Sequence, residues 1–181
     1  MIRLGSNSPT RAKILTSHNI KFIQQGGSFD EDSIKTTNAK EFCLLATKGK
    51  FNELYNKFGV DDYALLVADS VVMCENKLLR KAKSYEDAKY MLNLQSNNKT
   101  SVITSMIYKS KKLELHDISI TTYEFLPFCQ DDLENYLKSG ECFGKAGAIM
   151  VEGFCKKYIK SVKGFESCAM GLTIEKLIPY L

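Results

Sequence analysis

The sequence is poor in histidine and has no paired cysteine motif, and both absences restrict its metal chemistry. Only two histidines occur, His18 and His116, which excludes a histidine-rich metal site. The six cysteines are scattered, and no two of them follow a C-x-x-C spacing. Any metal ion is therefore expected to be held by carboxylate and phosphate oxygens, which favours Mg²⁺ or Mn²⁺.

The sequence also lacks long apolar runs and an N-terminal segment with the pattern of a signal peptide. No apolar segment approaches the roughly 20 residues that are needed to cross a bilayer. The first residues lack a basic region followed by an apolar one, so we expect no secretory signal peptide. No disulfide framework is evident either. We therefore expect reduced thiols, a cytoplasmic location and no membrane partner.

The charge is nearly balanced, with 25 Lys and Arg against 21 Asp and Glu and a net charge of +4. No basic run interleaved with aromatic residues occurs, so nucleic acid is not an expected partner. The mild positive excess fits a small ligand that carries phosphate. With 181 residues and 44% hydrophobic composition the chain can bury a core, and we expect a single two-lobed domain over residues 1–181.

The patterns along the chain indicate an α/β fold, because strand-like apolar runs alternate with helical periodicity. Helices are expected over 9–18, 38–58, 130–139 and 170–177, and after a capping Ser84. Strands are expected over 1–4, 20–25, 63–73, 77–79, 100–108, 113–124, 146–151 and 158–162. The two strands over 100–108 and 113–124 should form a long antiparallel hairpin.

The first loop combines small hydroxyl residues with the start of a helix. Ser8 suits the N-cap position and Pro9 the first helical position, where no N–H is needed. Ser6, Ser8 and the helix N-terminus would make an anion site, to which Arg11 adds a full positive charge. An ordinary capped helix start explains the same residues, so both interpretations stay open here.

Acidic residues occur at two informative positions. Asp69 interrupts a nearly continuous apolar strand, where an ionised carboxylate needs a partner, a proton or a metal ion. This setting favours a catalytic role over a satisfied structural aspartate. Asp30, Glu31 and Asp32 form an acidic run, which is either an exposed loop or a contact to metal or ribose.

A second small-residue region over 140–148 superficially suggests a phosphate loop. It is not a P-loop, because Gly140 to Gly144 is one residue short and Ala146 replaces the Ser or Thr that would hold Mg²⁺. Together with the first loop, Asp69 and the neighbouring lysines, this region nevertheless points to phosphate chemistry.

The order of these motifs resembles the Maf family of nucleoside triphosphate pyrophosphatases, also known as septum formation Maf-like proteins. The family's Ser-x-Ser-Pro-Arg-Arg loop is matched by 6–11, and its Asp-Glu pair by 30–31. A helical lysine follows, either Lys50 or Lys48. The remaining motifs are matched over 68–72, 80–82, 139–141 and 145–148. The resemblance covers the whole chain in the right order.

The resemblance implies an elongated central mixed β-sheet with helices in two lobes around a cleft, similar to inosine triphosphate pyrophosphatases. It implies hydrolysis of modified or non-canonical nucleoside triphosphates to monophosphate and pyrophosphate, with a divalent cation and a homodimer. The implied catalytic residues are Asp69, Lys50, Lys81 and Arg11, and the implied metal ligands are Asp69 and Glu31. The implied substrate-binding residues are Ser6, Ser8, Thr10, Glu31, Ser70, Lys145 and Glu152.

Three departures from the family pattern leave the base preference open. Thr10 stands in place of the first family Arg, Ser70 in place of a Thr, and Glu152 in place of a Gln. The subgroup acting on dTTP and UTP carries Arg, Thr and Gln, and the subgroup acting on 7-methyl-GTP carries Trp, Gln and Glu. A nucleotide-binding regulator of cell division and a nonspecific phosphatase are the alternative functions.

Overall fold

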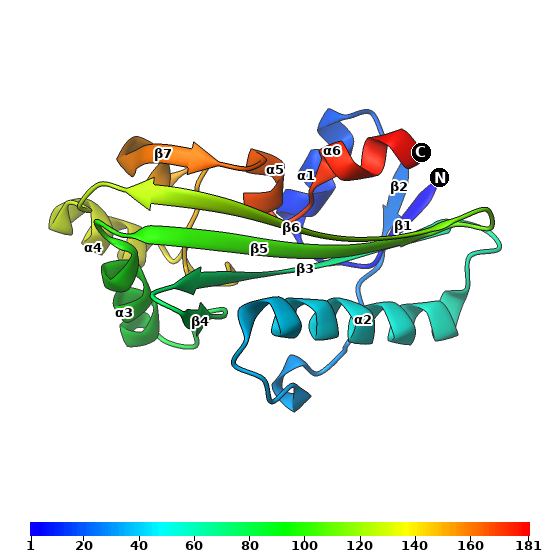
Figure 1. The fold of residues 1–181 in the computed structure, drawn as a ribbon, viewed down its shortest axis with the longest axis horizontal. Helices are drawn as coiled ribbons and strands as arrows, with labels where there is room; N and C mark the ends of the chain where they lie inside the picture. The colour runs from blue at the N-terminus through cyan, green and yellow to red at the C-terminus, as the bar shows by residue number, and fades with distance from the viewer.

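The structure, a computed structural model that describes all 181 residues, is an elongated mixed α/β protein built on one sheet (Figure 1). The expected fold class is confirmed. Seven strands form the sheet: β1 (Ile2–Leu4), β2 (Phe22–Gln24), β3 (Ala64–Cys74), β4 (Lys77–Leu79), β5 (Lys99–Lys109), β6 (Glu114–Phe125) and β7 (Ile159–Lys163).

Strand β3 is the centre of the sheet, whose order is β2-β1-β3-β5-β6-β7, with β4 paired to the far end of β3. Strands β2, β1 and β3 run parallel, whereas the other pairings are antiparallel. Asp69 lies opposite Ser105 of β5. The near-continuous apolar run of β3 is explained by this position, because both of its faces are covered.

Helices cover both faces of the sheet and one of its ends (Figure 1). The long helix α2 lies along one face, α1, α5 and α6 lie on the other, and α3 and α4 pack together at one end of the molecule. Their bounds are α1 (Pro9–Ser17), α2 (Ala39–Phe58), α3 (Tyr85–Gln95), α4 (Gln130–Ser139), α5 (Glu166–Ala169) and α6 (Ile174–Leu177). Short 3-10 turns are η1 (Glu31–Ser33), η2 (Phe154–Tyr158) and η3 (Ile178–Tyr180).

Side-chain caps begin three of the helices where the sequence placed them. The hydroxyls of Ser8 and Ser84 and the amide oxygen of Asn38 each accept a hydrogen bond from a backbone N–H in the first turn. The reciprocal half of a capping box is absent at α2. The Glu41 carboxylate instead accepts a hydrogen bond from the Thr36 hydroxyl, 2.5 Å away.

Two expected elements in the last quarter of the chain were wrong. Residues 146–151 form turns and not a strand, with one isolated bridge between Lys81 and Ala146. Gly147 and Ala148 have φ angles of 61° and 59°, and this left-handed backbone cannot continue a strand ladder. Of the expected helix over 170–177, only α6 is helical; α5 ends before this range, and the chain between α5 and α6 cannot continue a helix because Gly171 has a φ of 102°.

Apolar clusters on both sides of the sheet fix these elements in place. The largest cluster joins α3, α4 and the 142–158 region to the ends of β3, β5 and β6. A second packs α1 and α6 on β1 and β3, and two smaller ones pack α2 on the opposite face. None of the helices combines the length and the apolar character that a bilayer crossing requires.

Candidate functional site

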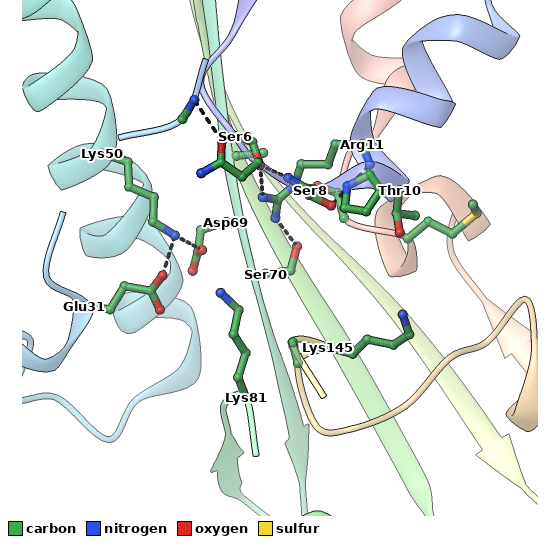
Figure 2. Close-up of a pocket in the computed structure, with 18 of the residues that line it drawn as sticks. Ser6, Ser8, Thr10, Arg11, Glu31, Lys50, Asp69, Ser70, Lys81 and Lys145 are labelled. Carbon is green, nitrogen blue, oxygen red and sulfur yellow. Dashed lines mark hydrogen bonds and ion pairs between the residues drawn. The ribbon is translucent and has the colours of Figure 1, made fainter. Parts of the chain in front are cut away.

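A cleft of about 580 Å³ opens across the middle of β3, and the catalytic and substrate-binding residues that the resemblance implied all line it (Figure 2). Its walls come from segments that are far apart in the chain. They are the first loop, the loop before η1, the middle of α2, the centre of β3, Lys81, the 143–152 turns and the α5–α6 connection.

The first loop is held tightly against β3 and α2. The Gly5 N–H donates to the Leu66 carbonyl at 2.8 Å, and a Cβ at Gly5 would lie 2.5 Å from Leu54 Cδ1. The Ser6 hydroxyl accepts a hydrogen bond from the Ser8 N–H, and the Ser8 hydroxyl accepts one from the Arg11 N–H. The capped helix start and the cleft lining therefore coincide in the same residues.

Arg11 is the fixed cation of this wall. Its Nε donates to the Gly171 carbonyl at 2.7 Å, Nη1 to the Ser6 hydroxyl at 3.0 Å, and Nη2 to the Ser70 hydroxyl at 3.3 Å. Burial lowers the pKa of Arg11, and the negative charge of Asp69 opposes that shift. All three hydrogen-bond partners are neutral, so the positive charge of the guanidinium is left for a ligand.

Asp69 sits at the floor of the cleft and is joined to α2 through Lys50 (Figure 2). The Lys50 ammonium lies 2.5 Å from Asp69 Oδ1 and 2.6 Å from Glu31 Oε1. Asp69 is only 4% exposed, and its Oδ2 is buried with no hydrogen-bond partner. The structure places Lys50 at this pair, whereas Lys48 is exposed and lies outside the cleft.

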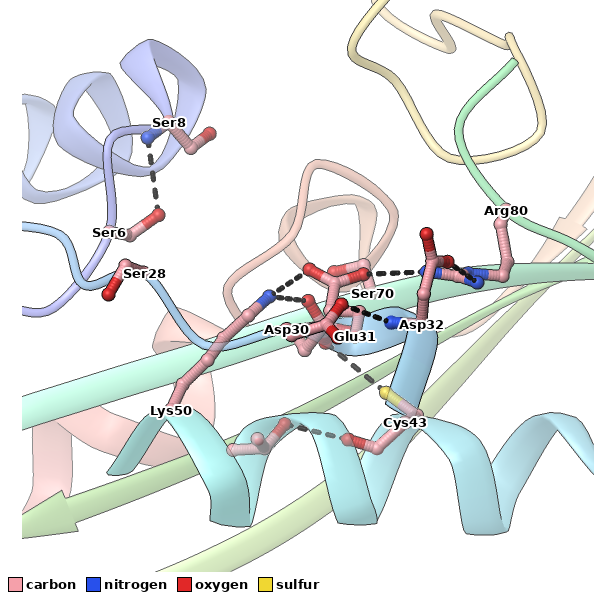
Figure 3. Close-up of polar contacts among 12 residues, drawn as sticks. Ser6, Ser8, Ser28, Asp30, Glu31, Asp32, Cys43, Lys50, Ser70 and Arg80 are labelled. Carbon is pink, nitrogen blue, oxygen red and sulfur yellow. Dashed lines mark hydrogen bonds and ion pairs between the residues drawn. The ribbon is translucent and has the colours of Figure 1, made fainter. Parts of the chain in front are cut away.

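The acidic run before α2 is an ordered turn in which Asp30 and Asp32 are exposed and Glu31 is half-buried (Figure 3). Asp30 caps η1 by accepting a hydrogen bond from the Asp32 N–H at 2.9 Å. Burial disfavours the ionised form of Glu31, but its hydrogen bond to Lys50 and the neighbouring cations outweigh that cost. The pKa of Glu31 therefore lies below its ordinary value, and the carboxylate is ionised beside Asp69.

The two remaining lysines enter the cleft differently. The Lys81 side chain points toward Asp69, whereas the Lys145 side chain runs away from it along the opposite wall (Figure 2). The backbone bridge between Lys81 and Ala146 ties these two walls together. The cleft therefore holds cations on several sides of a single buried carboxylate.

Thr10, Ser70 and Glu152, the three residues that differ from the expected motifs, lie at separate places in the cleft. Thr10 is half-buried in the first turn of α1, and Glu152 is exposed on the 143–152 turns. The Ser70 hydroxyl accepts from Arg11 and shares a 2.8 Å hydrogen bond with Thr104. Ser70 thus supports the Arg11 guanidinium, while Glu152 lies on a different wall.

Sequence reasoning missed some residues in and beside the cleft. Arg80 lies 2.7 Å from Asp32 Oδ1 and 3.6 Å from Glu31 Oε2. Its signals in the sequence were its place in the motif over 80–82 and in a basic run beside Lys81, and neither gave it a role. Phe143 is 42% exposed and lines the cleft. The Gly171 carbonyl that fixes Arg11 left no signal, because any residue carries a backbone carbonyl.

The donor set suits a divalent cation that arrives with phosphate. No cluster of three His, Cys, Asp or Glu side chains occurs that could enclose an ion by itself. The orphaned Asp69 Oδ2 and the nearby Glu31 carboxylate are the oxygen donors that the cleft offers. Mg²⁺ is usually bound by one or two carboxylates together with substrate phosphates, so these residues fit such an ion.

This chain is similar to known proteins over its whole length. The sequence pattern that defines the Maf-like protein family matches residues 1–181. A nucleoside triphosphate pyrophosphatase of a Nitratiruptor species is 49% identical over 179 residues, covering 98% of this chain and 96% of the relative.

More distant relatives carry the same name. The nucleoside triphosphate pyrophosphatase of Helicobacter pylori (strain J99) is 41% identical over 175 residues, covering 97% of this chain and 92% of its own length. The protein of that name from Campylobacter jejuni is 32% identical over 183 residues and is covered completely. Matched from end to end by the family pattern and by these relatives, the chain belongs to the Maf-like protein family.

Proposed function

We propose that this protein is a nucleoside triphosphate pyrophosphatase, which hydrolyses the bond between the α- and β-phosphates and releases monophosphate and pyrophosphate. One observation carries the proposal. Asp69, whose buried Oδ2 has no hydrogen-bond partner, lines a cleft together with four cationic side chains. The names of the relatives support the same activity.

The cations would bind the triphosphate along the cleft. Arg11 and the N-terminus of α1, with the Ser6 and Ser8 hydroxyls, would hold phosphate oxygens at one wall. Lys81, whose side chain points toward Asp69, and Lys145, whose side chain points away from it, line other parts of the cleft. Charge that develops on the non-bridging and leaving oxygens would be neutralised by groups already in place, and such preorganisation is a large contribution to catalysis.

Asp69 would act as the general base. Its Oδ2 would accept a proton from a water molecule as the water oxygen forms a bond to the α-phosphorus. The bond from the α-phosphorus to the bridging oxygen then breaks, and pyrophosphate leaves with that oxygen and the bonding electron pair. Lys50 holds the other carboxylate oxygen, so the orientation of the base is set before substrate binds.

In the alternative role, Asp69 Oδ2 would not act as the base but would hold a divalent cation, Mg²⁺ or Mn²⁺, together with Glu31, and the ion when bound would supply charge stabilisation at the phosphates. Lys50 keeps the two carboxylates at a fixed separation by contacting both of them. It also limits the repulsion between the two negative charges when the cleft is empty.

For the base of the nucleotide, we propose recognition by the 143–152 turns. Glu152 presents a carboxylate that can accept N–H groups and attract a cationic base such as 7-methylguanine. Its exposure within the cleft lining supports this role. A preference for a pyrimidine nucleotide such as dTTP or UTP is the competing proposal. Thr10 and Ser70 do not decide between the two, because they match the residues of neither subgroup.

We further propose a cytoplasmic location and a homodimer. The six cysteines are free, as expected in a reducing compartment. Exposed apolar side chains of α2 and β6, namely Leu44, Leu45, Ile118 and Ile120, supply apolar surface that a second copy would bury. Light scattering coupled to size exclusion would show a doubled mass, and a monomer at high concentration would refute the dimer.

A panel of triphosphates tests the activity. Purified protein with Mg²⁺ or Mn²⁺ is given dTTP, UTP, 7-methyl-GTP and the standard nucleotides, and pyrophosphate and orthophosphate are measured separately. Pyrophosphate from at least one substrate is expected, and orthophosphate alone would indicate a nonspecific phosphatase. Binding without any turnover, and a cell-division effect that survives Asp69→Asn, would favour the regulatory alternative.

A further inference from the structure

Arg80 lies outside the cleft and contacts both Glu31 and Asp32 of the acidic turn. It follows β4, and its guanidinium reaches across to η1 (Figure 3). Nη1 donates to Asp32 Oδ1 at 2.7 Å, and Nη2 lies 3.6 Å from Glu31 Oε2. The same side chain therefore contacts two consecutive carboxylates of one short turn.

The guanidinium is itself held in a fixed place. Its central carbon lies 4.7 Å from the ring centroid of Phe42, which is 2% exposed and belongs to the core under α2. This cation–π contact orients the guanidinium plane. At the backbone, the Arg80 carbonyl accepts a hydrogen bond from the Gly147 N–H at 2.9 Å. Arg80 thus joins η1, α2 and the turns that carry Lys145.

The two carboxylate oxygens of Glu31 face two different cations. Its Oε1 contacts Lys50 at 2.6 Å, while its Oε2 faces Arg80. Lys50 in turn contacts Asp69 Oδ1, the carboxylate at the floor of the cleft. A chain of contacts therefore runs from Arg80 through Glu31 and Lys50 to Asp69, although Arg80 does not line the cleft.

We infer that Arg80 is a positioning residue: it holds the acidic turn so that Glu31 fixes Lys50 against Asp69. This inference rests on the proposed pyrophosphatase function. Arg80 acts through Glu31 and makes no contact with the reacting phosphates. Its loss should therefore reduce kcat and leave KM nearly unchanged, since small misplacements of catalytic groups are costly.

The neighbouring Lys83 provides a matched control. Its ammonium also faces Asp32, at 3.5 Å from Oδ2, but it is 78% exposed and makes no contact with Glu31. Removing Lys83 takes one positive charge from the same turn without breaking the chain of contacts to Asp69. A general effect of local charge would appear in both variants, whereas positioning would appear only when Arg80 is changed.

The test compares Arg80→Gln, Arg80→Lys, Asp32→Asn, the double variant of Arg80→Gln with Asp32→Asn, and Lys83→Gln. Arg80→Gln should lower kcat about tenfold with KM within about twofold, and Arg80→Lys should fall between it and wild type. The double variant should be no slower than Arg80→Gln, because the two side chains act through one contact. Lys83→Gln should match wild type.

Crystal structures of wild type and Arg80→Gln give a readout that does not depend on turnover. The contact between Glu31 Oε1 and Lys50 should be present in wild type and lost in the variant. An active wild type with an unchanged kcat in Arg80→Gln would overturn the inference, and so would a variant structure that keeps the contact. A wild type that releases no pyrophosphate would refute the proposed function, while the two structures would still decide the role of Arg80.

Discussion

Lys50 Nζ lies 2.5 Å from Asp69 Oδ1, and this contact joins the middle of α2 to the centre of β3. Because Lys50 takes one carboxylate oxygen, only Oδ2 is left for a water molecule or a metal ion. The pair therefore does more than neutralise a buried charge. It leaves Oδ2 as the oxygen atom of Asp69 without a partner, and we propose that this atom meets the ligand.

Replacing Asp69 with asparagine should abolish pyrophosphate release and preserve the fold. The amide keeps the size of the side chain but cannot take a proton, so we expect a loss of about 10²–10⁴-fold in kcat. Turnover measured beside the thermal unfolding midpoint checks this expectation. Asp117→Asn, on β6 and outside the cleft, is the control and should keep full activity. Wild-type turnover in Asp69→Asn would refute the assigned base.

Lys50→Met and Lys48→Met should differ sharply, although the two lysines are two residues apart on α2. Losing Lys50 leaves Asp69 and Glu31 close together without their shared cation, which should cost on the order of 3 kcal/mol of unfolding free energy and most of the activity. Lys48 is exposed, so its loss should change neither. Urea unfolding and kcat measurements compare them, and equal effects would contradict the placement of Lys50.

Gly49→Ala should lower activity without destabilising the protein. A Cβ at position 49 would lie 2.2 Å from the Phe29 ring, which would have to move together with the turn that carries Glu31. The gain in helix propensity, about 1 kcal/mol, offsets the strain. Activity and unfolding are measured against Asn52→Ala, an exposed position on the same helix. An unchanged kcat would show that the Phe29 ring moves without affecting Glu31.

Glu134 should make the α3–α4 contact sensitive to acid. Hydrogen bonds from Lys89, 2.5 Å away, and from Tyr85 lower the pKa of Glu134 below the ordinary value of 4.5. A carboxylate with a depressed pKa stabilises the folded state above its ordinary pKa, and this stability is lost as the pH falls toward the folded value. Glu134→Gln should therefore lower the unfolding midpoint at pH 7 but much less at pH 3.

The exposed Glu86 on α3 is the control for this pH dependence. Glu86→Gln should leave the difference between the two pH values as it is in wild type, because Glu86 lies on the solvent side of the same helix. A Glu134→Gln variant that is destabilised equally at pH 7 and pH 3 would mean that packing, and not the ionised pair, joins α3 to α4.

Much of the fold could be predicted because local patterns and tertiary packing agree. Ser8 and Ser84 cap the helices that their sequence positions indicated, and the apolar run around Asp69 is the central strand. The strand prediction for the region after Lys145 was wrong for a local reason. Its apolar residues read as a strand, but Gly147 and Ala148 adopt positive φ angles that no periodicity reveals.

Site residues could be predicted from the sequence where their type and local setting indicated a role. They could not be predicted where the role depends on a contact between distant segments of the chain. Asp69 and Arg11 were conspicuous by residue type and setting. The choice between Lys50 and Lys48 required the helix to be placed against β3, because only then does one of them reach Asp69. Arg80 required the contact between η1 and the end of β4, which joins residues 48 positions apart.

The 143–152 turns have a consequence for how the protein can diversify. Their backbone makes no strand ladder with the sheet beyond the bridge at Ala146, whereas Asp69 is paired on β3. Substitutions at exposed positions such as Phe143 and Glu152 therefore disturb few structural contacts. The part of the cleft that we assign to the base can change during evolution while the phosphate chemistry stays fixed, so related proteins can acquire new nucleotide preferences at little cost in stability.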